Sequence, residues 1–120
     1  MKKILLIEDD HLLQKVLTLK LSSKYEVVTA ENGREGMEKA LSENPDLILL
    51  DLIMPEVSGF EFLVMVKAND KTKEIPIIIQ SALPSKEDIQ KAMDLGANNY
   101  LIKGNISLEK IMGLVGNYLN

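Results

Sequence analysis

Short apolar runs alternate along the chain with longer segments in which apolar residues recur every three or four positions. The short runs predict buried strands at residues 3–8, 25–30, 46–51, 76–81 and 98–102. The amphipathic segments predict helices at residues 10–22, 33–43, 59–68, 85–95 and 107–119. Because alternation of strand and helix is typical of parallel βαβ units, the sequence predicts one α/β domain over residues 1–120.

Several predicted helix boundaries carry their own chemistry. Asn32 and Ser58 each precede a glutamate by three residues, which is the spacing of a capping box. Ser85 and Ser107 are candidate caps for the last two helices. Gly96 follows the fourth helix, where a left-handed stop is expected.

The last predicted helix has an apolar face interrupted by glycine. Its stripe at helical spacing consists of Leu108, Ile111, Met112, Val115 and Leu119. Gly113 and Gly116 lie inside the helix, where each costs about 1 kcal/mol relative to alanine. We therefore expect this helix to depend on docking against the sheet. Leu114 and Tyr118 fall outside the stripe, either as scattered surface residues or as part of a partner surface.

Composition narrows the class of protein. The 120 residues, 46% of them apolar, are enough for one domain with a core. The chain has no cysteine, which excludes disulfides and thiolate metal sites. Its apolar stretches are too short for a membrane span or a secretory signal, and the net charge of -4 does not favour nucleic acid. We expect a cytoplasmic protein that binds neither membrane nor nucleic acid directly.

Acidic residues follow two of the predicted strands. Glu8, Asp9 and Asp10 come directly after the first strand, and Asp51 ends the third. Ligands of open α/β sheets bind just beyond the carboxyl ends of the strands. If these strands are neighbours, their acids share a pocket, where two like charges about 4 Å apart repel by roughly 4 kcal/mol at an effective dielectric of 20. A hard divalent cation such as Mg²⁺ is the expected occupant.

Three further observations suggest phosphoryl chemistry at the same edge. The carboxylate of Asp51 can act as a nucleophile toward phosphorus and form an acyl phosphate. Lys103 follows the fifth strand, and Ser81 ends the fourth, so both could donate to a phosphoryl oxygen. Each residue alone is more often a cap, a solvated charge or a turn residue. Their occurrence at the ends of four strands favours a shared function.

These segments together resemble the receiver domain of two-component response regulators, in particular the chemotaxis regulators. The matching segments are residues 6–10, 45–55, 58–61, 75–78, 81–82 and 96–103. The resemblance covers nearly the whole chain. It implies a flavodoxin-like (βα)5 three-layer sandwich with a parallel sheet in the order 2-1-3-4-5.

The resemblance also implies a role for each polar residue at the sheet edge. Asp51 would accept a phosphoryl group from a histidine kinase, and Lys103 would contact that group. Glu8, Asp9, Asp51 and the backbone carbonyl of Ile53 would hold Mg²⁺, with Glu8 acting mostly through water. The domain would be a regulator rather than an enzyme, with at most self-catalysed phosphotransfer and autodephosphorylation.

A conformational switch is the implied consequence of phosphorylation. Ser81 would move toward the phosphoryl group, and Tyr100 would rotate from outside to inside. The implied partners are a sensor histidine kinase or phosphotransfer protein, and a downstream target or an attached output domain. We expect a monomer or a weak phosphorylation-dependent dimer. A free-standing receiver and a fragment of a longer regulator both stay open.

The chain departs from the usual receiver pattern at three positions. Gly104 follows Lys103 where proline is usual, commonly with a cis bond, which for a non-proline residue costs about 2.5–4 kcal/mol. Glu8 replaces an aspartate, and this change keeps the charge. Ile53 places no polar side chain two residues beyond Asp51, which bears on how water reaches an acyl phosphate.

Three other functions remain as alternatives. An FMN site is disfavoured because the acids after the first strand repel phosphate, and a Gly-x-Gly-x-x-Gly motif for nicotinamide cofactors does not occur. A Mg²⁺-dependent phosphohydrolase usually needs an acid where Ile53 stands. A receiver-like interaction module that is never phosphorylated is the third. His11, the only histidine, is expected to be solvated or to have a local capping role.

Overall fold

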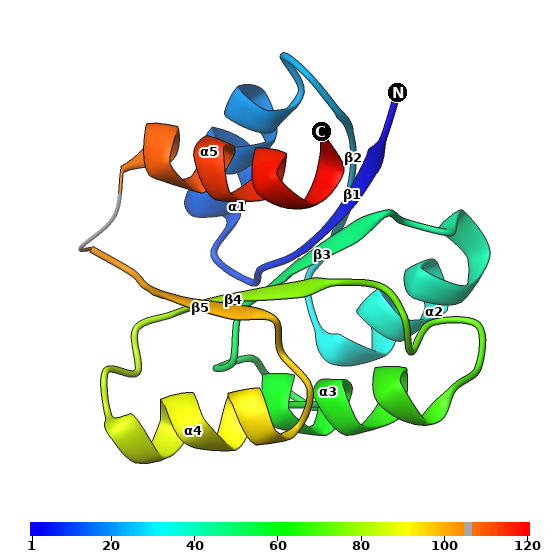
Figure 1. Cartoon of the computed structure of the whole chain (residues 1–120), viewed down its shortest axis with the longest axis vertical. Helices are drawn as coiled ribbons and strands as arrows, with labels where there is room; N and C mark the ends of the chain where they lie inside the picture. Colours follow the sequence, from blue (N-terminus) through cyan, green and yellow to red (C-terminus); the bar gives the residue numbers. More distant parts are fainter. Residues whose placement is uncertain (105–106) are drawn as a thin grey trace.

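Five parallel strands form one sheet in the order β2-β1-β3-β4-β5, with helices on both faces (Figure 1). The computed structural model describes residues 1–104 and 107–120. Its strands are β1 (Lys3–Ile7), β2 (Glu26–Ala30), β3 (Leu47–Leu50), β4 (Ile77–Ser81) and β5 (Asn99–Ile102). Its helices are α1 (His11–Leu21), α2 (Gly33–Glu43), α3 (Gly59–Ala68), α4 (Lys86–Asp94) and α5 (Leu108–Leu119). The predicted fold and strand order are confirmed.

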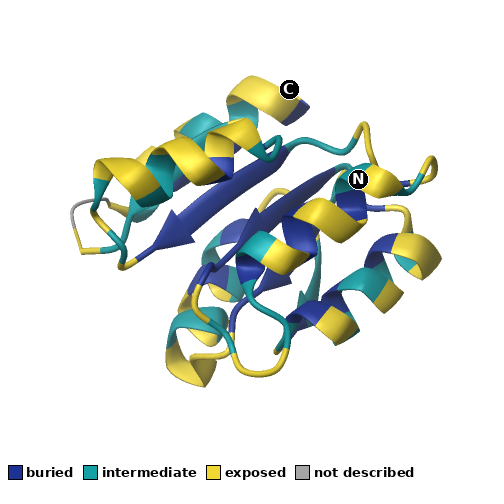
Figure 2. Cartoon of the chain, turned by 90° about the horizontal axis from the view of Figure 1, so that it is seen from below, coloured by how far each residue is buried: buried dark blue, intermediate teal, exposed yellow. Residues whose placement is uncertain are grey.

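Alternate residues of the central strands pack against opposite helix layers. Ile4 and Leu6 of β1 pack with α1 and α5, whereas Leu5 and Ile7 pack with α2, α3 and α4. Figure 2 shows buried strands between helices that are exposed only on their outer sides. Burial on both faces explains why these strands appear as continuous apolar runs rather than as an alternating pattern.

The predicted helix caps are used, but only one capping box is complete. Ser58 accepts the N–H of Glu61, and the Glu61 carboxylate accepts the N–H of Ser58. Asn32 likewise accepts the N–H of Glu35, but the Glu35 carboxylate accepts the N–H of Glu31 instead of that of Asn32. The other predicted caps that accept a backbone N–H three residues on are Ser85 and Ser107.

Two glycines adopt the left-handed conformation after secondary-structure elements. Gly96 has φ +111° after α4, as predicted for a helix stop. Gly104 has φ +88° directly after Lys103, a value that proline cannot adopt because its ring holds φ near −65°. Over the described residues every peptide bond is trans. Glycine therefore replaces the usual proline with a different backbone turn.

We expect Gly104→Ala to lower the free energy of unfolding by about 1 kcal/mol, because alanine is strained at positive φ. Among the residues that the structure describes, no atom lies within 4 Å of the added Cβ, so packing against them does not contribute. Gly113→Ala is the matched control, since its Cβ also meets open space but its backbone is helical. The free energy of unfolding of Gly113→Ala should rise by about 1 kcal/mol. Urea unfolding measures both, and changes of the same sign would contradict the expectation.

Candidate functional site

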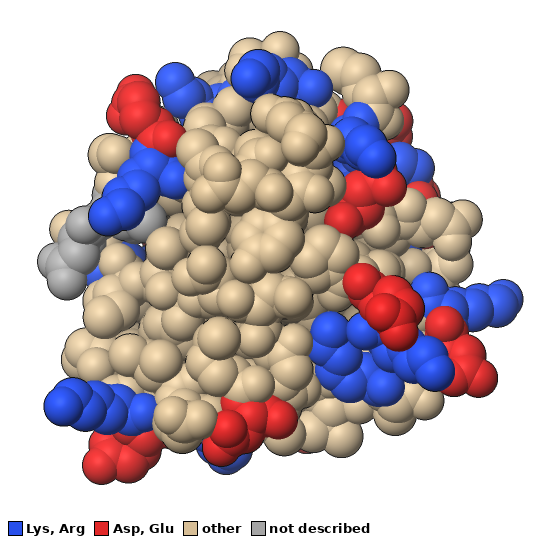
Figure 3. Space-filling model, in the orientation of Figure 1, with Lys and Arg blue, Asp and Glu red and all other residues tan. Residues whose placement is uncertain are grey.

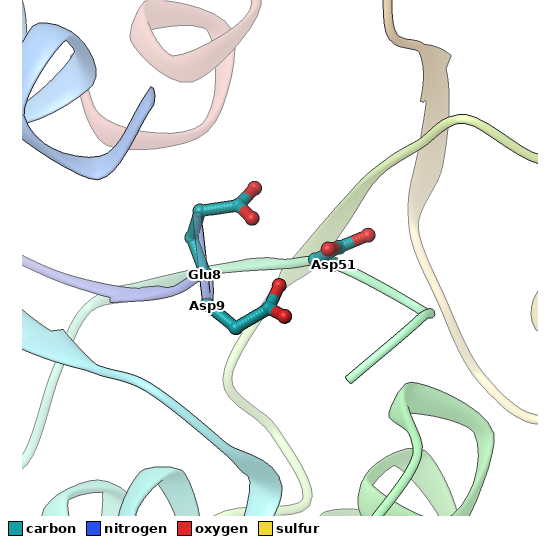
Figure 4. A group of neighbouring side chains, drawn as sticks. All are labelled: Glu8, Asp9 and Asp51. Atoms are coloured by element: carbon teal, nitrogen blue, oxygen red, sulfur yellow. The ribbon is translucent and has the colours of Figure 1, made fainter. Parts of the chain in front are cut away.

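Three carboxylates meet where β1 and β3 end side by side. The last residues of these strands, Ile7 and Leu50, are paired in register, so the acids that follow them are neighbours. One carboxylate oxygen from each of Glu8, Asp9 and Asp51 lies within 4.8 Å of the others (Figure 4). Glu8 is 0% and Asp51 4% exposed, whereas Asp9 is exposed. The predicted acidic pocket is therefore present, and its oxygen ligands suit a hard divalent cation.

Backbone hydrogen bonds continue one residue beyond both strands and hold the acids in place. The N–H of Glu8 donates to the carbonyl of Ala30 at 3.0 Å, and the N–H of Asp51 donates to the carbonyl of Ile7 at 3.0 Å. The positions of these two side chains consequently depend on sheet pairing rather than on a loop.

Asp10, the last member of the acidic triplet, caps the helix that follows. Its Oδ1 accepts the N–H groups of Leu12 and Leu13 at 3.0 and 3.1 Å and caps α1. The sequence analysis did not identify this cap. Its signal was an aspartate directly before an amphipathic segment.

Lys103 reaches the acidic pocket from β5. Its Nζ lies 2.8 Å from Glu8 Oε1 and 3.2 Å from Asp51 Oδ2. Although Gly104 replaces the usual proline, the ammonium lies beside Asp51 as expected. One cation thus faces three carboxylates, and the pocket keeps an excess of negative charge.

Burial and the Lys103 ammonium shift the pKa values of the buried acids in opposite directions. Burial raises the pKa of Glu8 from 4.5 to about 6, against the hydrogen bond from Lys103. Burial likewise raises the pKa of Asp51, again opposed by the Lys103 charge. Burial alone would lower the pKa of Lys103, but its hydrogen bond to Glu8 and the charge of Asp51 outweigh that effect and raise the pKa. The acids are held in a site that favours a further positive charge.

We expect the metal-free protein to lose stability as pH rises from 4.5 through 6. Folded Glu8 holds its proton more tightly than unfolded Glu8, so the stabilisation is complete below pH 4.5 and disappears above pH 6. The difference between these pKa values corresponds to about 2 kcal/mol. Urea unfolding in EDTA at several pH values checks this, with Glu8→Gln as reference. A difference between the two proteins that does not change with pH would contradict it.

Two glutamines complete the surroundings of Glu8, and the sequence analysis identified neither. The Gln80 amide lies 3.5 Å from Glu8 Oε1 and is buried in β4. The Gln14 amide donates to the carbonyl oxygen of Glu8 at 2.9 Å. The available signal was a single amide in the otherwise apolar run that includes Ile77, Ile78 and Ile79.

Ser81 and Tyr100 are joined through one residue of the loop after β4. Ser81 is fully buried, and its Oγ accepts the N–H of Leu83 at 3.2 Å. Tyr100 is half-buried, and its hydroxyl donates to the carbonyl of Leu83 at 2.8 Å. Both sides of the Leu83 backbone are therefore occupied by the two residues predicted to form the switch.

Ile53 and His11 both have exposed side chains. The N–H of Ile53 donates to Asp51 Oδ1 at 3.4 Å, and its side chain is exposed. The His11 side chain is exposed and lies 2.7 Å from the exposed carboxylate of Glu31, so it is solvated but does not act as a cap.

Comparison with known proteins identifies the family. Residues 4–115 match the family described as the response regulator receiver domain. The chain belongs to this family. The polar-differentiation response regulator DivK of Brucella anthropi is 34% identical over 119 residues, which cover 98% of this chain and 96% of DivK. The response regulator ArlR of Staphylococcus saprophyticus is 39% identical over 104 residues, which cover 86% of this chain.

Solved structures agree with this assignment. The chemotaxis protein CheY4 of Vibrio cholerae superimposes with a TM-score of 0.91 at 30% identity, over 98% of both chains. The match with this chain covers 96% of DivK but only 46% of ArlR, so the chain spans about half the length of that relative. The predicted family is confirmed, and with it a phosphoacceptor domain of two-component systems, which is a signalling regulator rather than a classical enzyme. None of the helices in residues 1–104 and 107–120 is long and apolar enough to cross a membrane.

Proposed function

We propose that Asp51 of this receiver domain accepts a phosphoryl group from the phosphohistidine of a sensor histidine kinase or a phosphotransfer protein. The supporting observation is the convergence of Glu8, Asp9, Asp51 and Lys103 at the carboxyl edge of the sheet. A carboxylate oxygen of Asp51 forms the new bond to phosphorus while the bond between phosphorus and the imidazole nitrogen breaks. The nitrogen keeps the electron pair of the broken bond, and an acyl phosphate results.

The pocket residues fit the Mg²⁺ that receiver domains bind. Glu8, Asp9 and Asp51 would provide carboxylate oxygens, and the backbone carbonyl of Ile53 would provide a neutral one. When bound, Mg²⁺ neutralises negative charge on phosphoryl oxygens. Lys103 pairs with Asp51 before phosphorylation and donates to a phosphoryl oxygen afterwards.

The bonds at Leu83 support a mechanism for the switch. For the Ser81 hydroxyl to reach a phosphoryl oxygen, Ser81 gives up the N–H of Leu83 that it now accepts. Leu83 is then free to move, and its carbonyl no longer accepts the Tyr100 hydroxyl in the same position. Tyr100, which already packs against the core on the side of α2, α3 and α4, changes its position, and the surface around β4, α4 and β5 changes. Phosphorylation needs to supply only a few kcal/mol to shift such a two-state equilibrium.

The outer face of α1 is the candidate docking surface for the phosphoryl donor. Leu12 and Leu19 are 74% and 72% exposed, and Val16 lies between them at helical spacing. Exposed apolar residues that share one helix face commonly mark a protein contact. The helix begins immediately after Asp10, so a protein bound to this face lies beside the pocket.

Intact mass spectrometry after incubation with acetyl phosphate and Mg²⁺ tests the proposal. We expect the mass of one phosphoryl group, assigned by peptide mapping to Asp51, and no addition when EDTA replaces Mg²⁺. An unmodified wild-type protein would support the interaction module instead. Repeated turnover of a small phosphate ester would support the phosphohydrolase.

A further inference from the structure

The Glu8 carboxylate is buried, whereas the charged groups of this protein usually lie at the surface. On the face shown in Figure 3, Lys, Arg, Asp and Glu lie around the rim, where water can solvate them. Glu8 is 0% exposed, and a buried carboxylate needs donors in place of water. Among the residues that the structure describes, three donors reach it. The Lys103 ammonium and the Gln80 amide lie 2.8 and 3.5 Å from Oε1, and the N–H of Asp10 lies 3.1 Å from Oε2.

The Gln80 amide is a polar group in an otherwise apolar part of β4. Gln80 is 3% exposed, and the residues that precede it in the strand are Ile77, Ile78 and Ile79. A residue that only fills space at this position could be apolar and would leave no buried polar atoms to satisfy. Packing therefore does not explain the amide, whereas its contact with the Glu8 carboxylate does.

Gln80 meets Glu8 across an intervening strand. The residues at the corresponding level of β1, β3 and β4 are paired in register, namely Ile7, Leu50 and Ile79. Glu8 and Gln80 follow the outer two of these residues, so their backbones lie about 10 Å apart with β3 between them. Both side chains are long enough to share this distance, whereas an aspartate in place of Glu8 is one methylene shorter. The glutamate that replaces the usual aspartate is thus matched to Gln80.

Gln80 and Lys103 contact the same oxygen of Glu8 but differ in what happens to them on phosphorylation. In the proposed mechanism Lys103 turns to a phosphoryl oxygen, so Glu8 loses its nearest donor. The Gln80 amide takes no part in that exchange and keeps its contact with Glu8. Because an amide is neutral, it orients the carboxylate without cancelling the negative charge that attracts a cation.

We infer that Gln80 is a positioning residue, which holds the Glu8 carboxylate at the Mg²⁺ pocket before and after Lys103 turns to the phosphoryl group. The inference rests on the proposed function, in which Glu8 helps to hold Mg²⁺. Removal of a hydrogen bond that orients a metal-binding side chain typically weakens metal binding by roughly ten- to a hundredfold. The contact between Gln80 and Glu8 is long, at 3.5 Å, so we expect an effect at the lower end of this range, about tenfold.

Gln80→Met tests the inference, because methionine keeps the length of the side chain and removes the donor. Isothermal titration calorimetry of the full chain with MgCl₂, without a phosphoryl donor, should give a Kd for Mg²⁺ about tenfold above that of the wild type. Gln90→Met is the matched control. The Gln90 amide also donates to a carboxylate, that of Asp94, but on the exposed face of α4, so this variant should bind Mg²⁺ as the wild type does. Urea unfolding establishes that both variants are folded.

The dependence of phosphorylation on Mg²⁺ concentration separates positioning from a general disturbance of the site. In Gln80→Met the Mg²⁺ concentration that gives half the maximal rate with acetyl phosphate should rise about tenfold. The rate at saturating Mg²⁺ should stay within about twofold of the wild-type rate, since Asp51 and Lys103 are intact. A lower saturated rate with an unchanged Mg²⁺ requirement would overturn the inference.

A measurement on the wild type does not depend on the folding of a variant at position 80. The side-chain amide resonances of Gln80 in a nitrogen–proton NMR spectrum should shift when Mg²⁺ is added, because the carboxylate that the amide contacts then faces a cation. Resonances that stay in place while Mg²⁺ binds would count against the inference.

A second substitution shows whether the amide acts through Glu8. Glu8→Asp keeps the charge but does not reach Gln80, so adding Gln80→Met to it should change the Kd for Mg²⁺ by less than about twofold. An equal Kd for the wild type and Gln80→Met would overturn the inference and leave the proposed function standing. An effect of undiminished size in the Glu8→Asp background would also overturn it, because the amide would then act by another route. A wild type that binds no Mg²⁺ would contradict the proposed function, and the inference would fall with it.

Discussion

Asp51→Asn is expected to take up no phosphoryl group from acetyl phosphate and, in the absence of Mg²⁺, to unfold at a higher temperature than the wild type. An amide is not a nucleophile for phosphorus under these conditions, so the first effect is complete. The second arises because burial raises the pKa of Asp51 above its ordinary value of 3.8. Above that pH the ionised side chain disfavours the folded state, and its removal is stabilising.

The Tm of Asp51→Asn should therefore lie above that of the wild type in EDTA. Mg²⁺ should reverse the order of the two unfolding temperatures. The wild type gains stability from the bound ion, whereas Asp51→Asn has lost one of the three carboxylates. Asp70→Asn is the control, since this side chain is 94% exposed and distant from the pocket. Thermal unfolding and intact mass measure both effects. Phosphoryl uptake by Asp51→Asn would assign the acceptor to another residue.

Lys103→Met is expected to slow phosphorylation by a factor of about 10² to 10³, the usual cost of removing one donor to a developing charge. Without Mg²⁺ it should also lower the free energy of unfolding by about 2 kcal/mol. Removal of one partner from a buried ion pair costs 3–5 kcal/mol, and we reduce that figure because the lysine side chain is 25% exposed. Methionine keeps the length of the side chain, so the effect isolates the charge.

Mg²⁺ should restore most of the stability of Lys103→Met but not its rate. A divalent cation can replace the ammonium between Glu8 and Asp51, whereas it cannot supply the same hydrogen bond to a phosphoryl oxygen. Lys71→Met, an exposed lysine in the loop after α3, should match the wild type in both measurements. Unchanged phosphorylation kinetics in Lys103→Met would remove this lysine from the mechanism.

The sequence was sufficient to predict the sheet and the acidic pocket for a physical reason. Strands buried on both faces form unmistakable apolar runs, and a parallel sheet brings the residues that follow neighbouring strands to one edge. Glu8, Asp9 and Asp51 are placed by this rule alone. The same rule predicts the position of Lys103. Its long side chain extends from β5 past the end of β4 to reach the acids.

The features that the sequence did not predict depend on contacts between distant segments. The amide of Gln80 meets Glu8 from another strand, and the hydroxyl of Tyr100 meets the carbonyl of Leu83 across 17 positions of sequence. No local pattern encodes these pairings. The role of Asp10 was not predicted for another reason. This aspartate could be a pocket acid or a helix cap, and its place in the acidic triplet favoured the first interpretation, although it caps α1.

The two buried acids are tied to the backbone hydrogen bonds of the sheet, which makes the pocket as durable as the centre of the domain. Glu8 and Asp51 can leave their positions only when β1 separates from its neighbours β2 and β3. The outer helices can therefore shift during a conformational change while the acceptor site keeps its shape.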